Sequence, residues 1–161
     1  MPLTSYKEFT LRPATNADIS AIKLVVFGVL EEYNLKGSET GKDRDLSDVE
    51  KNYFGNNGYF GVAVDSTNFE VVGTFGLYPV TTSTCELRKM YLLRRARGKG
   101  LGEFILNFAI QTAKEKNYKR VLLETVSPLK EAISLYKKHG FKEIPPKEVS
   151  DRVDQAFELK L

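Results

Sequence analysis

The sequence has one cysteine, one histidine and no tryptophan among its 161 residues. Cys85 has no second cysteine with which to form a disulfide, and Cys85 with His139 is too small a set for a zinc site of cysteine and histidine ligands. A serine protease-like triad would have to use His139, which precedes a helix-ending Gly140 and is expected at the surface. We therefore predict no metal site, and a cytoplasmic protein, since unpaired cysteine suits a reducing compartment.

Long apolar runs are also missing. The longest, residues 24–30, is seven residues with a glycine inside it, whereas a transmembrane helix needs about 20. The first eight residues lack the apolar core and the cleavage site of a secretory signal. We expect neither a membrane partner nor export.

Charge of one sign is scarce overall but locally concentrated. The net charge of +3 is too small to predict a nucleic-acid-binding protein. Residues 88–102 nevertheless hold six Lys or Arg and no Asp or Glu, so an anionic ligand is expected there. RNA is the alternative ligand from another class, although no aromatic residue stands among residues 94–99 to stack on its bases.

Hydrophobic periodicity predicts one α/β (α+β) domain over residues 1–161. Helical spacing begins after Thr15 as N-cap, and residues 34–45 are expected to be a mobile loop. Strands are predicted at 9–12, 59–64, 70–78, 85–93, 120–125, 141–144 and 155–161, and helices at 15–33, 46–54, 98–116 and 127–140. Asp45 or Ser47 is the expected N-cap of the second helix. Ser127 is the expected N-cap of the last helix, and Pro128 its first residue.

The order of these elements predicts a mixed sheet of about seven strands flanked by about four helices. Short turns join the three strands of residues 59–93, which indicates an antiparallel meander. The unit of strand 85–93, helix 98–116 and strand 120–125 requires a parallel pair with a right-handed crossover.

The segment Arg97-Gly98-Lys99-Gly100-Leu101-Gly102 joins that strand to that helix. Three alternate glycines at a helix start each cost about 0.5–1 kcal/mol relative to alanine, so they need a reason. Without Cβ atoms, the amides can approach phosphate oxygens, and Arg97 and Lys99 add positive charge. The spacing fits neither the P-loop nor the dinucleotide fingerprint. It predicts a site for a phosphate-bearing cofactor.

The same hexapeptide matches the pattern [QR]-x-x-G-x-[GA] through Arg97, Gly100 and Gly102. Together with residues 86–92 (ELRKMYL) and 132–141 (AISLYKKHGF), it resembles the Gcn5-related N-acetyltransferase (GNAT) superfamily. The resemblance implies a GNAT fold, acetyl-CoA as donor, and an amine as the usual acceptor.

The resemblance also implies roles for single residues. The segment of Arg97, Gly98, Lys99, Gly100, Leu101 and Gly102 would bind the pyrophosphate of acetyl-CoA, and the backbone of Met90 and Leu92 its pantetheine arm. Tyr136 would protonate the thiolate, although periodicity alone suggests a core aromatic. Glu86 would accept the proton of the amine, with Glu124 as second candidate and a solvated strand-edge residue as the alternative for Glu86. Two positions depart from the family pattern. Arg94 stands where the family has a proline, and Leu129 where it has an asparagine that helps to orient the cofactor; Ser127, Thr125 or a backbone contact would have to take over that role.

Strand alternation places Cys85 opposite Glu86, so direct transfer is favoured over an acetyl-cysteine route. The chemical class of the acceptor can be predicted only from the distribution of charge. Residues 31–50 carry more acids than bases, which suits an ammonium-bearing substrate, while Arg44, with Tyr33, would bind an acceptor that also carries a carboxylate. We expect a small-molecule amine or an amino acid as acceptor, with a protein acceptor as the alternative. The charges of residues 31–50 could instead belong to a solvated loop without such a role. Two further alternatives stay open: a sensor that binds acyl-CoA without turnover, and a homodimer.

Overall fold

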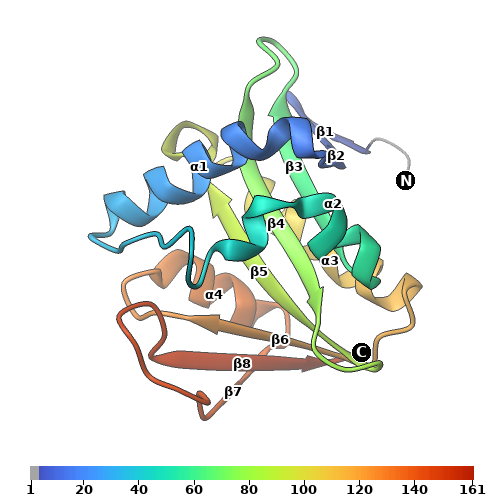
Figure 1. Ribbon diagram of the computed structural model, residues 1–161, viewed down its shortest axis with the longest axis vertical. Helices are drawn as coiled ribbons and strands as arrows, with labels where there is room; N and C mark the ends of the chain where they lie inside the picture. Colours follow the sequence, from blue (N-terminus) through green and yellow to red (C-terminus); the bar gives the residue numbers. More distant parts are fainter. Residues whose placement is uncertain (1–3) are drawn as a thin grey trace.

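The computed structural model describes residues 4–161 (Figure 1), so the first three residues of the segment tested for a secretory signal lie outside the described residues. Eight strands form one sheet in the order β1-β2-β3-β4-β5-β6-β8-β7. They are β1 (Thr4–Tyr6), β2 (Phe9–Pro13), β3 (Tyr59–Asp65), β4 (Val71–Pro79), β5 (Thr84–Leu92), β6 (Arg120–Thr125), β7 (Lys142–Ile144) and β8 (Gln155–Lys160). The helices are α1 (Ile19–Glu32), α2 (Val49–Asn52), α3 (Leu101–Glu115) and α4 (Lys130–Lys138).

The sheet confirms the predicted mixed topology. Strands β3, β4 and β5 form the antiparallel meander, and β5 and β6 are parallel, with α3 as the crossover. The one strand that the sequence did not predict is β1, which pairs with β2 through Thr4 to Leu11 and Tyr6 to Phe9. Its three residues are too few for a period of two to be recognised.

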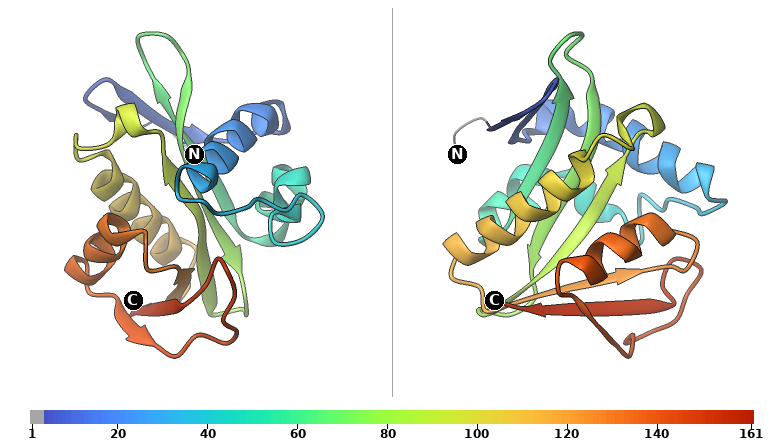
Figure 2. Two further views of the ribbon diagram at one scale, coloured as in Figure 1. Left: turned by 90° about the vertical axis from the view of Figure 1, so that its left-hand side faces the viewer. Right: turned by 180° about the vertical axis from the view of Figure 1, so that it is seen from behind.

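Helices cover both faces of the sheet. Helices α1 and α2 lie on one face, whereas α3 and α4 lie on the other (Figures 1 and 2). On the first face Ile22, Val26 and Leu30 of α1 are buried against the sheet. On the second, the apolar stripe of α3, which includes Leu101 and Ile105, is buried there. The helical spacing that predicted these two stripes is therefore confirmed.

Three helix boundaries differ from the predicted ones. Helix α2 spans only Val49–Asn52 and is capped by Asp48, whose carboxylate accepts a hydrogen bond from the amide of Lys51 at 2.9 Å. Helix α3 starts at Leu101 because Gly98 and Gly100 have φ angles of +73° and +85°, outside the helical region.

Helix α4 begins at Lys130, so Ser127 and Pro128 are not its cap and first residue. The Ser127 hydroxyl and amide instead donate hydrogen bonds to Asp154. Ser127 is thus held by the loop before β8 and does not face the start of the helix.

A buried carboxylate fixes the segment between α1 and α2, which was predicted to be a mobile loop. The side chain of Asp43 is fully buried. It accepts hydrogen bonds from both terminal nitrogens of Arg152 at 2.6 and 2.9 Å and from the amide of Ser38 at 2.8 Å. The ammonium of Lys89 lies 3.2 Å from it. Ion pairs from β5 and from the loop before β8 therefore anchor this segment.

Replacement of Asp43 by alanine is expected to destabilise the fold by about 3 kcal/mol at pH 7, because Arg152 and Lys89 would stay buried without their partner. Burial works to raise the pKa of Asp43, but the hydrogen bonds from Arg152 and Ser38 and the charge of Lys89 outweigh it and lower the pKa. A carboxylate with a lowered folded pKa stabilises the fold above its ordinary pKa of about 4 and loses that effect as the pH falls through the folded pKa.

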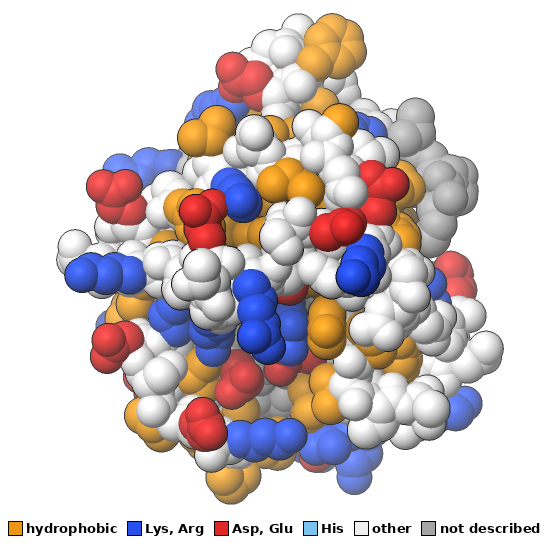
Figure 3. Space-filling view, viewed as in Figure 1, with side chains coloured by type: hydrophobic (Ala, Val, Ile, Leu, Met, Phe, Trp, Pro, Cys, Tyr) orange, Lys and Arg blue, Asp and Glu red, His pale blue; other side chains and the backbone are white. Residues whose placement is uncertain are grey.

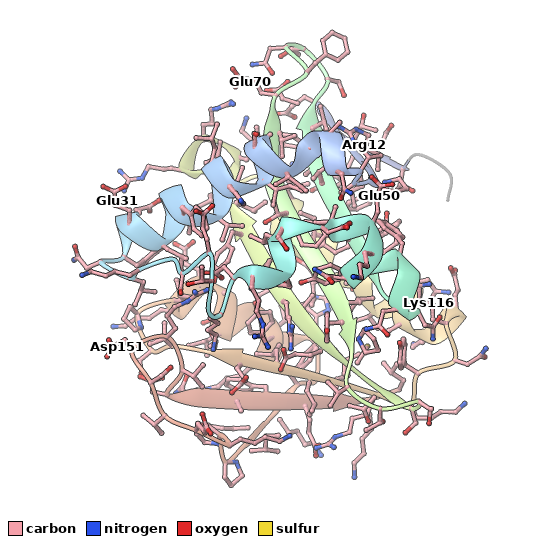
Figure 4. All side chains as sticks on the ribbon, viewed as in Figure 1. Arg12, Glu31, Glu50, Glu70, Lys116 and Asp151 are labelled. Carbon is pink, nitrogen blue, oxygen red and sulfur yellow. The ribbon has the colours of Figure 1, made fainter. Side chains whose placement is uncertain are left out.

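The difference in free energy of unfolding between wild type and Asp43→Ala should therefore shrink as urea denaturation is repeated from about pH 6 down to about pH 2.5. Asp151→Ala is the control, because Asp151 adjoins Arg152 in sequence but is exposed (Figure 4). Equal stabilities of the two variants at pH 7 would contradict the anchor.

Candidate active site

The strands β5 and β6 separate soon after they begin. They pair only from Thr84 to Glu86 with Arg120 to Leu122, after which β6 continues beside β8 alone. Figure 1 shows the two strands spreading apart from this point. A cavity of about 890 Å³ fills the opening, lined by β5, β6, the C-terminal half of α1, the start of α3, α4 and residues 41–47. The predicted candidate residues Glu86, Met90, Leu92 and Tyr136 all line it.

A β-bulge reshapes the wall of the cavity along β5. Thr74 pairs with Tyr91 but Gly76 pairs with Arg88, so β5 contains one extra residue. This residue is Lys89, which has a φ of +55° and whose carbonyl accepts a hydrogen bond from the Thr74 hydroxyl at 2.6 Å. The bulge was not predicted from the sequence. The signal was the polar doublet Arg88-Lys89, which interrupts the alternation of the strand.

The glycine segment forms an open approach to the N-terminus of α3. No atom lies within 4 Å of where a Cβ of Gly98 would stand, and one on Gly102 would make only ordinary contacts, at 3.6 Å. At Gly100 a Cβ would lie 2.3 Å from the Tyr6 hydroxyl, which donates to the carbonyl of Lys99. A substitution at Gly100 would therefore cause backbone strain and a clash with Tyr6, whatever its effect on a ligand. A substitution at Gly102 lacks both problems and tests access to the helix N-terminus.

The basic side chains of residues 94–99, in and just before the glycine segment, are paired with glutamates. The pairs are Arg94–Glu32, Arg95–Glu70, Arg97–Glu32 and Lys99–Glu8. Arg97 binds both carboxylate oxygens of Glu32, at 2.5 and 2.9 Å, and donates from Nε to the carbonyl of Leu92 at 3.0 Å. Arg97 and Lys99 are thus engaged within the chain, and backbone amides remain the groups of this segment that face an anion. The pairing also makes the run a weak electrostatic match for RNA.

Tyr136 combines a buried ring with access to the cavity. Its ring centroid lies 5.8 Å from that of Phe141 and 6.5 Å from that of Phe157, and 6% of the residue is exposed. Within residues 4–161 its hydroxyl has no hydrogen-bond partner. Burial, with a smaller effect of Tyr91, raises the pKa of Tyr136 well above its ordinary value. The phenol therefore stays protonated and can donate its proton into the cavity.

The two candidate carboxylates differ in their partners. Glu86 forms an ion pair with Arg88, whose guanidinium stacks on the ring of Tyr78 at 4.0 Å. Glu124 lines the cavity from β6 and is exposed to it, and no cation in the described part of the chain lies at ion-pair distance from it. Of the two, Glu124 is the carboxylate whose lone pairs are not already held.

Cys85 faces away from the cavity, as strand alternation predicts. It is fully buried in the core beneath α3, and burial raises the pKa of its thiol to about 12. A thiol with that pKa is protonated at neutral pH and is a poor nucleophile. The geometry gives Cys85 no part in the chemistry of the cavity.

The acidic wall expected from residues 31–50 does not face the cavity. Only Asp45 among its seven acids lines it, and Glu31 and Glu50 stand exposed on α1 and α2 (Figure 4). The remaining acids have partners elsewhere: Glu32 pairs with Arg97, Glu39 with Lys23 and Asp43 with Arg152, and Asp48 caps the start of α2. The prediction of an ammonium-bearing acceptor was argued from an acidic wall, and this premise is wrong. Periodicity could not reveal these partners because most of them are distant in sequence.

The two predicted acceptor residues both line the cavity, but at different places. The ring of Tyr33 lies 5.9 Å from the guanidinium of Arg97, beside the glycine segment. Arg44 belongs to the anchored segment on the opposite side of the opening. Leu129, which stands where the family has asparagine, also lines the cavity, with Thr125, whereas Ser127 is held by Asp154.

No group of three or more His, Cys, Asp or Glu side chains in residues 4–161 has the arrangement of a metal site. No helix in the same range is long and apolar enough to cross a bilayer.

Comparison with known proteins gives a consistent result. Residues 27–141 match the model of the family described as acetyltransferase (GNAT) family. The Escherichia coli (strain K12) protein named uncharacterized N-acetyltransferase YjgM is 39% identical over 140 residues, covering 83% of this chain and 82% of that protein.

Solved structures show the same fold. A GNAT-family acetyltransferase of Staphylococcus aureus MU50 superposes with a TM-score of 0.86 at 23% identity, covering 94% of this chain and 98% of that one. The PaiA N-acetyltransferase of Thermoplasma acidophilum, solved in complex with coenzyme A, gives a TM-score of 0.75 at 20% identity and covers 95% and 99%.

Proposed function

Because the chain belongs to the acetyltransferase (GNAT) family, and so is an acetyl-CoA-dependent N-acyltransferase, we propose that it transfers acetyl directly to the amine of a small acceptor bound between residues 41–47 and β6. The single observation that carries this proposal is the opening between β5 and β6, which brings the edge of a strand, a helix N-terminus, a protonated phenol and a carboxylate to one cavity.

The residues present fit acetyl-CoA at the glycine segment. Gly98 and Gly102 leave room for the approach of phosphate oxygens to the amides at the start of α3, a helix of 15 residues. Beyond Glu86, the edge of β5 that faces β6 has no strand partner, so the backbone near Met90 is open to an extended ligand, whereas the Leu92 carbonyl already accepts a hydrogen bond from Arg97. When bound, acetyl-CoA supplies a thioester, whose C–S bond breaks as the C–N bond to the amine forms.

The chain supplies the two proton transfers of this reaction. Tyr136 donates a proton to the sulfur that leaves, since burial keeps its phenol protonated. Glu124 accepts the proton that the amine loses, because its carboxylate is exposed in the cavity without a cation. Glu86, held by Arg88, is the second candidate for this role.

Gly102→Val is expected to weaken acetyl-CoA binding by about tenfold or more, because the added methyl groups would occupy the approach to the α3 amides. Isothermal titration calorimetry measures the affinity, and thermal unfolding checks that the variant folds. Gly28→Val is the matched control, since Gly28 lies in α1 with nothing within 4 Å of its Cβ position. Unchanged affinity in a folded Gly102→Val protein would place the phosphate site elsewhere.

Tyr136→Phe keeps the ring and removes the proton, so kcat should fall by about 10²-fold or more while the affinity for acetyl-CoA is retained. The raised pKa of Tyr136 also predicts no loss of wild-type kcat from its ionisation up to about pH 10. Coenzyme A release under single-turnover conditions measures the chemical step. Equal rates for the two proteins would return Tyr136 to a purely structural role.

Glu124→Gln and Glu86→Gln separate the two candidate bases. The rate of acetyl transfer below pH 8 should fall by about 10²-fold in Glu124→Gln and recover toward high pH, where the acceptor loses its own proton. Glu86→Gln should mainly disturb the position of Arg88 and lower the rate less. The opposite order of the two variants would assign the base to Glu86.

A further inference from the structure

Ten charged side chains line the cavity, and most of them neutralise each other or a residue just behind the wall. The lining cations are Lys42, Arg44, Arg88, Lys89, Arg97 and Arg152, and the lining acids are Asp45, Glu86, Glu124 and Glu131. Their pairs are Arg88–Glu86, Lys89–Asp45, Lys89–Asp43, Arg152–Asp43 and Arg97–Glu32. Each paired group has its charge balanced before any ligand enters.

Four charges remain without an ion-pair partner among residues 4–161. Lys42 and Arg44 come from the anchored segment, Glu124 comes from β6, and Glu131 lies on α4, where its charge acts on Arg97 at the glycine segment. The part of the cavity away from that segment therefore holds two unpaired cations and one unpaired carboxylate. In Figure 3, Lys and Arg side chains gather in the middle of the face, between α1 and β6.

The backbone that carries the two cations is held in place. Lys42 and Arg44 flank Asp43, the fully buried carboxylate anchored by Arg152 and Lys89. The carbonyl of Lys42 also accepts a hydrogen bond from the ammonium of Lys89, at 3.4 Å. Residues 42 and 44 thus extend from a fixed point, and both of their side chains reach the cavity.

Lys42 lines the same cavity as both candidate bases. Burial lowers its pKa, while the charges of Glu124 and Glu86 act in the opposite direction. An unpaired cation and an unpaired carboxylate that line one cavity, with space between β5 and β6, match the two ends of a small zwitterion. An arginine fork also binds a carboxylate in bidentate fashion, and a lysine adds a point charge.

We propose that the acceptor is a small amine that also carries a carboxylate, such as a free α-amino acid, and that Lys42 and Arg44 bind this carboxylate while Glu124 faces the amine. This inference rests on the proposed function and narrows its substrate class. Amines without an acidic group, and the N-termini of longer peptides, lack the second charge and fit the site less well.

The test compares each of several α-amino acids with its carboxamide as acceptor, in the full-length protein, by coenzyme A release. Wild type should use the acids with a KM at least about tenfold lower than that of the amides. Lys42→Ala and Arg44→Ala should each raise the KM for acids by about tenfold and leave kcat, the KM for amides and the KM for acetyl-CoA nearly unchanged. Lys36→Ala is the control, since Lys36 is exposed in the same segment and does not line the cavity.

Two outcomes would overturn the proposal alone: equal use of acids and amides by wild type, or variants that affect both acceptors alike. A preference for 2-aminoethyl phosphate or for a peptide N-terminus would also overturn it, because the acceptor would then belong to another substrate class. If wild type binds acetyl-CoA but acetylates no amine, the proposed function fails, and the substrate class fails with it.

Discussion

The early separation of β5 from β6 is the constraint on which the rest of the structure depends. Only three residue pairs join these strands before β6 turns to β8 alone. A sheet usually pairs its interior strands along their length, because unpaired backbone donors and acceptors are costly when buried. Here the unpaired edge of β5 borders a cavity, where water or an extended ligand can satisfy it. The bulge at Lys89 adds to this opening by turning a lysine side chain toward the segment that closes it.

Charge pairing then decides which groups around the opening can act on a ligand. The cations of residues 94–99 are held by glutamates of α1, of the loop before β4 and of the β1–β2 turn, so the glycine segment presents its amides more than its side chains. In the segment between α1 and α2, Asp43 balances the charges of Arg152 and Lys89. Binding energy at such a site comes from the few charged groups left without partners, because an ion that already has a counter-ion gains little from a second one.

The sequence predicted the parts that local rules determine. The strands at 59–93, the strand at 120–125 and the stripe of α3 follow from periods of two and 3.6. The parts it missed depend on contacts between distant residues: Arg97 meets Glu32 across 65 positions, and Arg152 meets Asp43 across 109. No periodicity in one segment encodes which acid a distant arginine will reach, so an acid-rich stretch was mistaken for an acidic surface.

The separation of roles between Tyr136 and the carboxylates follows from the same architecture. Tyr136 belongs to a helix on the face of the sheet where aromatic rings surround it, and desolvation there keeps its proton on the phenol. Glu124 stands on the edge that the opening exposes, where solvent reaches its carboxylate. Tyr136 and Glu124 thus place a protonated phenol and a solvent-exposed carboxylate at one cavity. Because β6 leads directly into α4, the position of the opening fixes both groups together.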